Sequence, residues 1–222
     1  MRHFDEELEN LKNKLLEMSG LVEAAVYRSV SSVIDRDIVQ AQSVIGGEKR
    51  VNQLQVEIDE LAIALLALQA PVGGDLRLIA VALKINNDLE RMGDLAVRIA
   101  RNGLTLAKVP PTHPDIDIPL LASKVQVMVR KSLDSFVQRD SSLARNVLES
   151  DDEVDRLRDS QVKELISFMQ RQPQQIRETV DLLSIVRLLE RIADHATNIA
   201  EDVVYLINGV DVRHTPHRAA SG

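Results

Sequence analysis

Apolar residues recur every three or four positions through six long segments of this 222-residue chain. One segment carries Val51, Leu54, Ile58, Leu61, Leu65 and Leu68, and another carries Ile185, Leu189, Ile192, Ala196, Ile199, Val203 and Leu206. This spacing predicts long helices that pack along one seam. We predict helices at residues 4–35, 37–69, 74–106, 116–139, 140–171 and 174–208. Gly46 and Gly47 each cost about 1 kcal/mol of helix propensity, which allows a kink or a short break in the second helix.

The pattern occurs twice along the chain. Residues 85–100 and 185–200 are identical at eight of sixteen positions, and Arg36 and Asp37 return 103 positions later as Arg139 and Asp140. The prolines fall between the periodic segments, where they do not break a helix. The sequence therefore predicts an all-α fold of two tandem three-helix bundles. Their bounds are 1–106 and 120–209, with a Pro-rich connector at 107–119 and a tail at 210–222.

Composition narrows the function classes. Without cysteine the chain has no disulfides, thiolate metal sites or cysteine nucleophiles. The net charge of −7 argues against broad contact with a nucleic-acid backbone. The longest unbroken apolar run, LAIALLAL at 61–68, is far too short to span a bilayer, and the first thirty residues have no apolar signal region. We expect a soluble, cytoplasmic protein that does not bind nucleic acid directly.

Two carboxylates occupy the same helical phase in both copies of the repeat. Glu90 and Asp94 point away from the seam of their bundle, one turn apart, and Glu190 and Asp194 repeat that placement. Acids on an outer helix face are ordinarily only solvated. Their recurrence raises the prospect of a shared role, and polar residues on the preceding helix and further along the last one extend both stripes: Glu48, Asn52, Asp151, Asp155 and Glu201. Clustered carboxylates suit Mg, Ca, Mn or Fe.

The remaining motifs give weaker evidence of a functional site. His195 follows Glu190 by five residues, which does not match the Glu-x-x-His spacing of a ferritin-like di-iron site. His214 and His217 fall in the tail after the last predicted helix. The glycines at 73 and 74 follow no strand and precede no Lys-Ser/Thr, so they predict a helix-helix turn, not a phosphate loop. The sequence offers no nucleophile-base arrangement.

Several motifs, taken together, resemble those of a known family. Each half closes with LER followed by MGD or IAD, the first half carries VNQLQVEIDELAIALLALQAPVGGDLRLI, and NGVDVRH follows the last helix. Over roughly residues 5–214 the chain is similar to PhoU proteins. The resemblance implies a homodimeric, cytoplasmic protein, peripheral to the membrane through its partners. It further implies a negative regulator of phosphate uptake and starvation signalling that links the Pst transporter ATPase to a PhoR-type histidine kinase.

The resemblance also implies surface metal sites holding divalent or trivalent ions, iron clusters first and Zn, Mn or Mg as alternatives. The family's Glu-x-x-x-Asp motifs fall on Glu90 and Asp94 and on Glu190 and Asp194. The second-helix positions Asp151, Asp155, Glu48 and Asn52 match less firmly. Where the last helix has Asn198, Glu201 and Asp202, the third helix has Arg98, Arg101 and Asn102, so we expect tighter binding in the second half. A carboxylate-bridged metal-dependent hydrolase is the alternative, although nothing in the sequence requires an enzyme.

Overall fold

The protein is an all-α molecule in a computed structural model that describes residues 2–112 and 114–213. Within those ranges it contains long helices, one 3-10 turn (Pro173–Gln175) and no strand. The predicted helices are confirmed to within two residues at every end, and α2 continues unbroken through Gly46 and Gly47. The helix bounds are α1 (Arg2–Ile34), α2 (Ile38–Gln69), α3 (Gly73–Leu106), α4 (Ile118–Gln138), α5 (Ser141–Arg171) and α6 (Ile176–Asn208).

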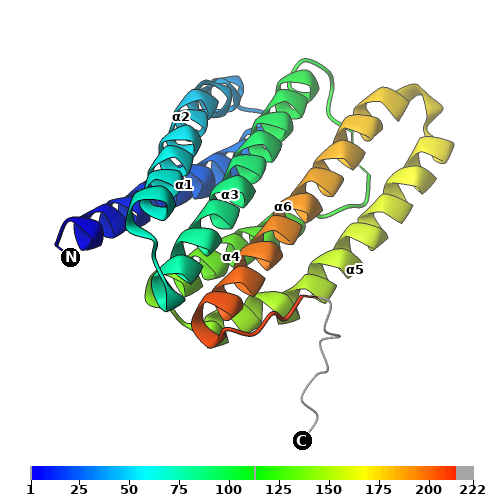
Figure 1. Ribbon diagram of the computed structural model, residues 1–222. Coiled ribbons are helices and arrows are strands. Elements are labelled where there is room, and N and C mark those ends of the chain that lie inside the picture. Colours follow the sequence, from blue (N-terminus) through cyan, green and yellow to red (C-terminus); the bar gives the residue numbers. More distant parts are fainter. Residues whose placement is uncertain (1, 113, 214–222) are drawn as a thin grey trace, which may run out of the picture.

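The helices form two three-helix bundles that lie side by side (Figure 1). Helices α3 and α6 run next to each other in the middle, α1 also meets α4, and α2 and α5 lie at opposite outer edges. One apolar core runs through both bundles, with Leu11, Ile85 and Leu189 fully buried in it. No described helix combines the length and the apolar character that a bilayer crossing requires.

The helix boundaries repeat in geometry as well as in sequence. Arg36 and Arg139 both adopt a left-handed conformation, with φ of 55° and 51°. Each is followed by an aspartate that caps the next helix: Asp37 accepts the N–H of Gln40, and Asp140 accepts that of Ser142. A side-chain acceptor at this position satisfies an amide that has no partner within the helix. The Arg-Asp pair therefore starts the outer helix of each bundle.

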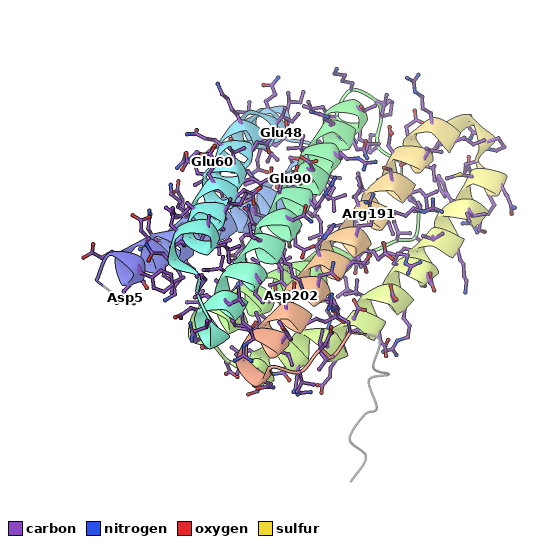
Figure 2. All side chains as sticks on the ribbon, viewed as in Figure 1. Asp5, Glu48, Glu60, Glu90, Arg191 and Asp202 are labelled. Carbon is purple, nitrogen blue, oxygen red and sulfur yellow. The ribbon has the colours of Figure 1, made fainter. Side chains whose placement is uncertain are left out.

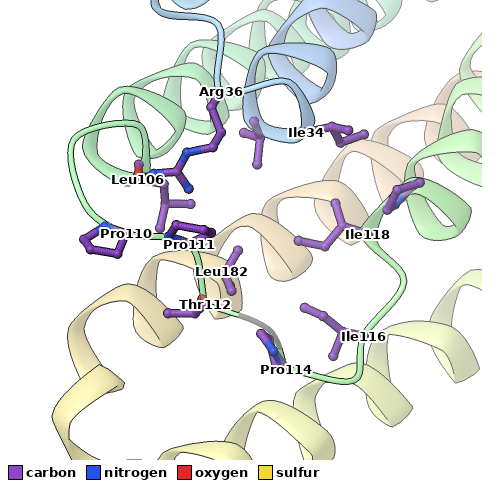
Figure 3. A pocket seen from close by; sticks show the side chains of 12 residues that line it. Ile34, Arg36, Leu106, Pro110, Pro111, Thr112, Pro114, Ile116, Ile118 and Leu182 are labelled. Carbon is purple, nitrogen blue, oxygen red and sulfur yellow. Dashed lines mark hydrogen bonds between the residues drawn. The ribbon is translucent and has the colours of Figure 1, made fainter.

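The connector between the bundles packs across the end of α1 and α3. The guanidinium of Arg36 donates to the carbonyls of Leu106 and Val109, so it ties the turn after α1 to the start of the connector. A cavity of about 340 Å³ opens beside it, lined mostly by apolar and proline side chains (Figure 3). Pro119 lies in the first turn of α4, where its missing N–H has no helical acceptor to lose.

The two bundles meet through polar pairs that obey the repeat. Lys84 on α3 donates to Asp202 on α6 at 2.7 Å. Their counterparts, 100 positions away in each direction, are Ser184 and Asn102, and these also bond, at 3.1 Å. Equivalent positions thus face each other across antiparallel helices, which is the arrangement of a pseudo-twofold axis. The carboxylate stripes of α3 and α6 consequently lie on either side of this boundary.

Candidate functional site

Four carboxylates converge from α5 and α6 in the second bundle. Asp151 and Asp155 lie one turn apart on α5, and Glu190 and Asp194 lie one turn apart on α6. Across the pair of helices, Asp151 and Asp155 raise the pKa of Glu190, Asp155 raises that of Asp194, and Asp194 raises that of Asp151. The hydroxyl of Thr197 donates to the Asp151 carboxylate at 3.2 Å. The structure thus brings together four of the residues that the sequence analysis singled out.

The environment of this cluster disfavours its negative charge. Burial, followed by the charge of a neighbouring carboxylate, raises the pKa of Glu190 and of Asp194. The pKa of Asp151 is also raised, mainly by burial, although the bond from Thr197 opposes the change. Acids held close together and partly out of water gain from any cation that joins them. The electrostatics of the cluster therefore favour the binding of a cation.

A guanidinium lies within the cluster. Arg158 contacts Asp155 at 2.7 Å, Asp159 at 2.9 Å and Glu190 at 3.1 Å. Sequence reasoning missed Arg158, although its place three residues after Asp155 was a usable signal. Its repeat counterpart is the neutral Gln55. The second half therefore also has an arginine in contact with its acids, in addition to the contrast that the sequence draws between Arg98 and Arg101 in the first half and Asn198 and Glu201 in the second.

The first bundle holds a smaller set. Burial, and then the charge of Asp94, raises the pKa of Glu90, and Glu48 acts on it in the same direction. Figure 2 shows Glu48 on α2 and Glu90 on α3. Arg101 contacts Glu48 at 3.7 Å and Arg91 contacts Glu90 at 3.6 Å.

Two further residues of the first set, Asn52 and Arg98, are exposed. Within the described residues neither forms an ion pair or a side-chain hydrogen bond with the acids of this set. We expect Arg98 and Arg101 to weaken metal binding at this set. Arg101 contacts one acid of the set, Glu48.

A polar pair that the sequence analysis did not identify lies between the two sets. The carboxylate of Asp88 on α3 lies 2.8 Å from Nδ1 of His195 on α6, and the Asn198 amide donates to the same oxygen at 3.4 Å. His195 also opposes the raised pKa of both Glu90 and Asp194. A hollow of about 440 Å³ opens beside His195 and Asp194. The imidazole thus links the two carboxylate sets electrostatically.

Glu201 lines a separate hollow further along α6. This hollow, of about 480 Å³, also includes Lys84, Asp88, Asp202 and Arg213. Asp202 is nearly inaccessible, and its pKa is raised by burial in opposition to the bond from Lys84. Glu201 therefore adds its charge to a mixed acidic and basic surface next to the four-carboxylate cluster.

The donor chemistry of the second cluster suits a hard metal ion. It supplies carboxylate oxygens and a hydroxyl, which Mg, Mn, Ca and Fe accept. Across residues 2–112 and 114–213, no group of three or more His, Asp or Glu side chains is already arranged around a common metal position. Arg158 pairs with two of the four carboxylates, Asp155 and Glu190, and so competes with a cation for them. The donor atoms are of the type that a hard metal ion binds. In this structure the positive charge next to them is the guanidinium of Arg158.

Comparison with known proteins accounts for the repeat. The family model described as PhoU domain matches twice, at residues 15–103 and 118–203. A relative from Pseudomonas aeruginosa, named phosphate-specific transport system accessory protein PhoU homolog, is 39% identical over 214 residues, covering 96% of this chain and 88% of that protein. The crystal structure of PhoU from Pseudomonas aeruginosa has a TM-score of 0.91 at 38% identity and covers 93% of this chain and 100% of its own. The phosphate transport system regulatory protein PhoU from Streptococcus pneumoniae has a TM-score of 0.86 at 30% identity, with 94% and 99% covered. The chain, with its two repeated three-helix bundles, belongs to the PhoU family.

Proposed function

We propose that this protein is an accessory protein of a phosphate-specific transport system that represses phosphate uptake and phosphate-starvation signalling. It acts in the cytoplasm as a non-catalytic adaptor and contacts the transporter ATPase and a PhoR-type histidine kinase. It reaches the membrane through these proteins, and it self-associates as a homodimer. Direct binding to nucleic acid is not part of this function.

The observation that carries the proposal is the likeness of nearly the whole chain to proteins named as accessory and regulatory parts of phosphate transport. Both bundles take part in that likeness, so it is not confined to one shared motif. The hydrolase alternative has less support. Its carboxylates would have to hold two activating ions in a partly dry pocket, whereas Arg158 already neutralises part of the cluster.

The second cluster is the favoured metal site of this adaptor. Asp151, Asp155, Glu190 and Asp194 would hold a divalent or trivalent ion, with iron first and Zn, Mn or Mg as alternatives. Bound there, the ion would neutralise the cluster and reshape the charge of the face that α5 and α6 present. Glu90, Asp94 and Glu48, with Asn52, form the corresponding candidate set in the first bundle, while Asn198 and Glu201 extend the second set along α6.

Deletion of the gene tests the regulatory role. In phosphate-rich medium the deletion strain should express a phosphate-starvation reporter at a high level, because the repressing adaptor is gone. A plasmid copy of the wild-type gene should restore repression. Normal repression in the deletion strain would contradict the proposed function.

Affinity purification tests the adaptor role directly. The tagged protein should retain the transporter ATPase and the histidine kinase from cells that express both. If regulation depends on the protein but neither partner is retained, the regulatory role stands and the adaptor mechanism is wrong.

A further inference from the structure

The outer face of α2 exposes apolar side chains to solvent. Val39, Val56, Ile63 and Leu68 are 75%, 55%, 60% and 79% exposed. The last two belong to the apolar run LAIALLAL, of which only part reaches the core. Helix α2 lies at one outer edge of the molecule, so no other element covers this face (Figure 1). A helix that is apolar on its outer side as well as its inner side is typical of a buried helix.

The second repeat provides an internal comparison. The counterparts of Val39, Val56 and Leu68 on α5 are Ser142, Asp159 and Arg171, and only Ile63 has an apolar counterpart, Ile166. The outer face of α5 also carries Arg145, Glu149, Asp152, Arg156 and Lys163, all exposed. One position in the fold therefore has a solvated face in the second repeat and an apolar face in the first. The difference indicates that α2 is covered by another molecule.

We propose that a second copy of this chain covers the face, with the two α2 helices antiparallel and Lys49 opposite Glu60 of the second copy. A twofold interface must be self-complementary. Lys49 and Glu60 lie on the same side of α2, both are exposed, and neither forms an ion pair within the described residues. Figure 2 labels Glu60 on this helix. The twofold axis forms the Lys-Glu pair twice.

The same register matches the apolar positions. It sets Ile63 opposite Gly46 of the second copy, because each lies three residues beyond the charged residue of its half. A Cβ on Gly46 would meet nothing within 4 Å, so packing within the chain does not explain this glycine. Its missing side chain leaves room for Ile63 of the second copy. Leu68 comes within about one helical turn of Val39 of the second copy.

The charge of the face favours a second copy over a lipid surface. Anionic membranes attract clusters of Lys and Arg, whereas on this face Lys49 is matched by Glu60 and Arg50 is paired with Glu57, and the chain has a net charge of −7. The inference rests on the proposed self-association and names the face that produces it. It is independent of the carboxylate sets on α3 and α6.

Sedimentation of the full chain at several concentrations tests the interface. Ile63→Asp should raise the dimer dissociation constant by about 100-fold, because two apolar contacts are lost per dimer. Ile166→Asp, the matched change on α5, should leave the constant unchanged. Circular dichroism on both variants checks that they remain folded.

A charge exchange tests the register. Lys49→Glu and Glu60→Lys should each weaken the dimer by about tenfold, since each places like charges opposite one another twice. The double variant should return to within about threefold of the wild type. A wild type that stays monomeric at high micromolar concentration would overturn both the self-association and this interface. A dimer that Ile63→Asp leaves intact, or a double variant that is not restored, would overturn the interface alone.

Discussion

Asp88 and His195 join the two repeats through a contact of 2.8 Å between a carboxylate oxygen on α3 and the imidazole Nδ1 on α6. Their counterparts in the repeat are Leu188 and Leu95, each 3% exposed. The boundary between the bundles thus holds a polar pair at one pair of positions and leucines at the equivalent pair. Both a polar pair and a pair of leucines are therefore compatible with the fold at this boundary.

We expect that removing one member of this pair lowers the stability strongly, whereas replacing both members with leucine lowers it little. His195→Leu should lower the free energy of unfolding by about 2–3 kcal/mol, because it removes the closest partner of the buried Asp88 carboxylate. The double variant Asp88→Leu/His195→Leu should recover most of that loss, since leucines occupy the equivalent positions. Urea unfolding of the wild type, both single variants and the double variant measures the difference. A double variant less stable than either single one would contradict this view.

The two carboxylate sets should differ in metal affinity. The second offers four carboxylates, whereas in the first Arg101 contacts Glu48 and Asn52 replaces an acid. More converging carboxylates bind a hard cation more tightly. Glu190→Ala/Asp194→Ala should therefore remove more bound metal than Glu90→Ala/Asp94→Ala, as measured by elemental analysis and titration calorimetry. A larger loss from the first-half pair would reverse the argument, and no loss from either pair would leave both sets as docking or solvated surfaces.

Arg158 should compete with metal for the second cluster. Arg158→Gln introduces the residue that occupies the matching position in the first repeat. It removes a positive charge 3.1 Å from Glu190 and 2.7 Å from Asp155. We expect Mn²⁺ affinity to rise by about tenfold, the change that 1.4 kcal/mol produces. Arg156→Gln, an exposed neighbour on the same helix, is the control, and equal effects of the two changes would rule out a specific role for Arg158.

The raised carboxyl pKa values should make the stability of the metal-free protein depend on pH. Because the pKa of Asp194 is higher in the folded protein than its ordinary value, the folded state holds this proton more strongly than the unfolded chain does. Its contribution to stability is therefore present at low pH and is lost as pH rises from about 4 through the raised pKa.

Asp194→Asn removes this dependence. It should stabilise the chelated protein at pH 7 by a few tenths of a kcal/mol up to about 1 kcal/mol, and the gain should vanish as pH falls towards 4. Thermal unfolding across this range measures it, with the exposed Asp152→Asn as control. A gain that grows as pH falls would show the opposite sign.

Two helical glycines should respond in opposite directions to alanine. A Cβ on Gly103 would lie 3.1 Å from a methyl of Val33, whereas a Cβ on Gly20 would meet nothing within 4 Å. Gly103→Ala should destabilise the protein by about 1–3 kcal/mol through overpacking. Gly20→Ala should stabilise it by about 0.5–1 kcal/mol through helix propensity. Chemical denaturation compares the two, and a destabilised Gly20→Ala would contradict the open surroundings of that residue.

The sequence by itself determined the elements and their repetition. The three- and four-residue apolar spacing, the prolines between segments and the Arg-Asp pairs are local signals, and each acts through the backbone of its own segment. They were enough to predict every helix to within two residues. A helical wheel, which needs only the sequence, also sets Glu90 and Glu190 off the apolar seam, but it does not show that both side chains are partly buried.

The tertiary structure decided which side chains from different helices meet. Arg158 joins Glu190, and Asp88 joins His195 across the boundary of the bundles. Neither pairing follows from the periodicity, because spacing along one helix does not fix the rotation and offset of its neighbour. Those are set by how the whole set of apolar faces packs together. The same packing leaves the outer face of α2 uncovered, which the run LAIALLAL alone could not reveal.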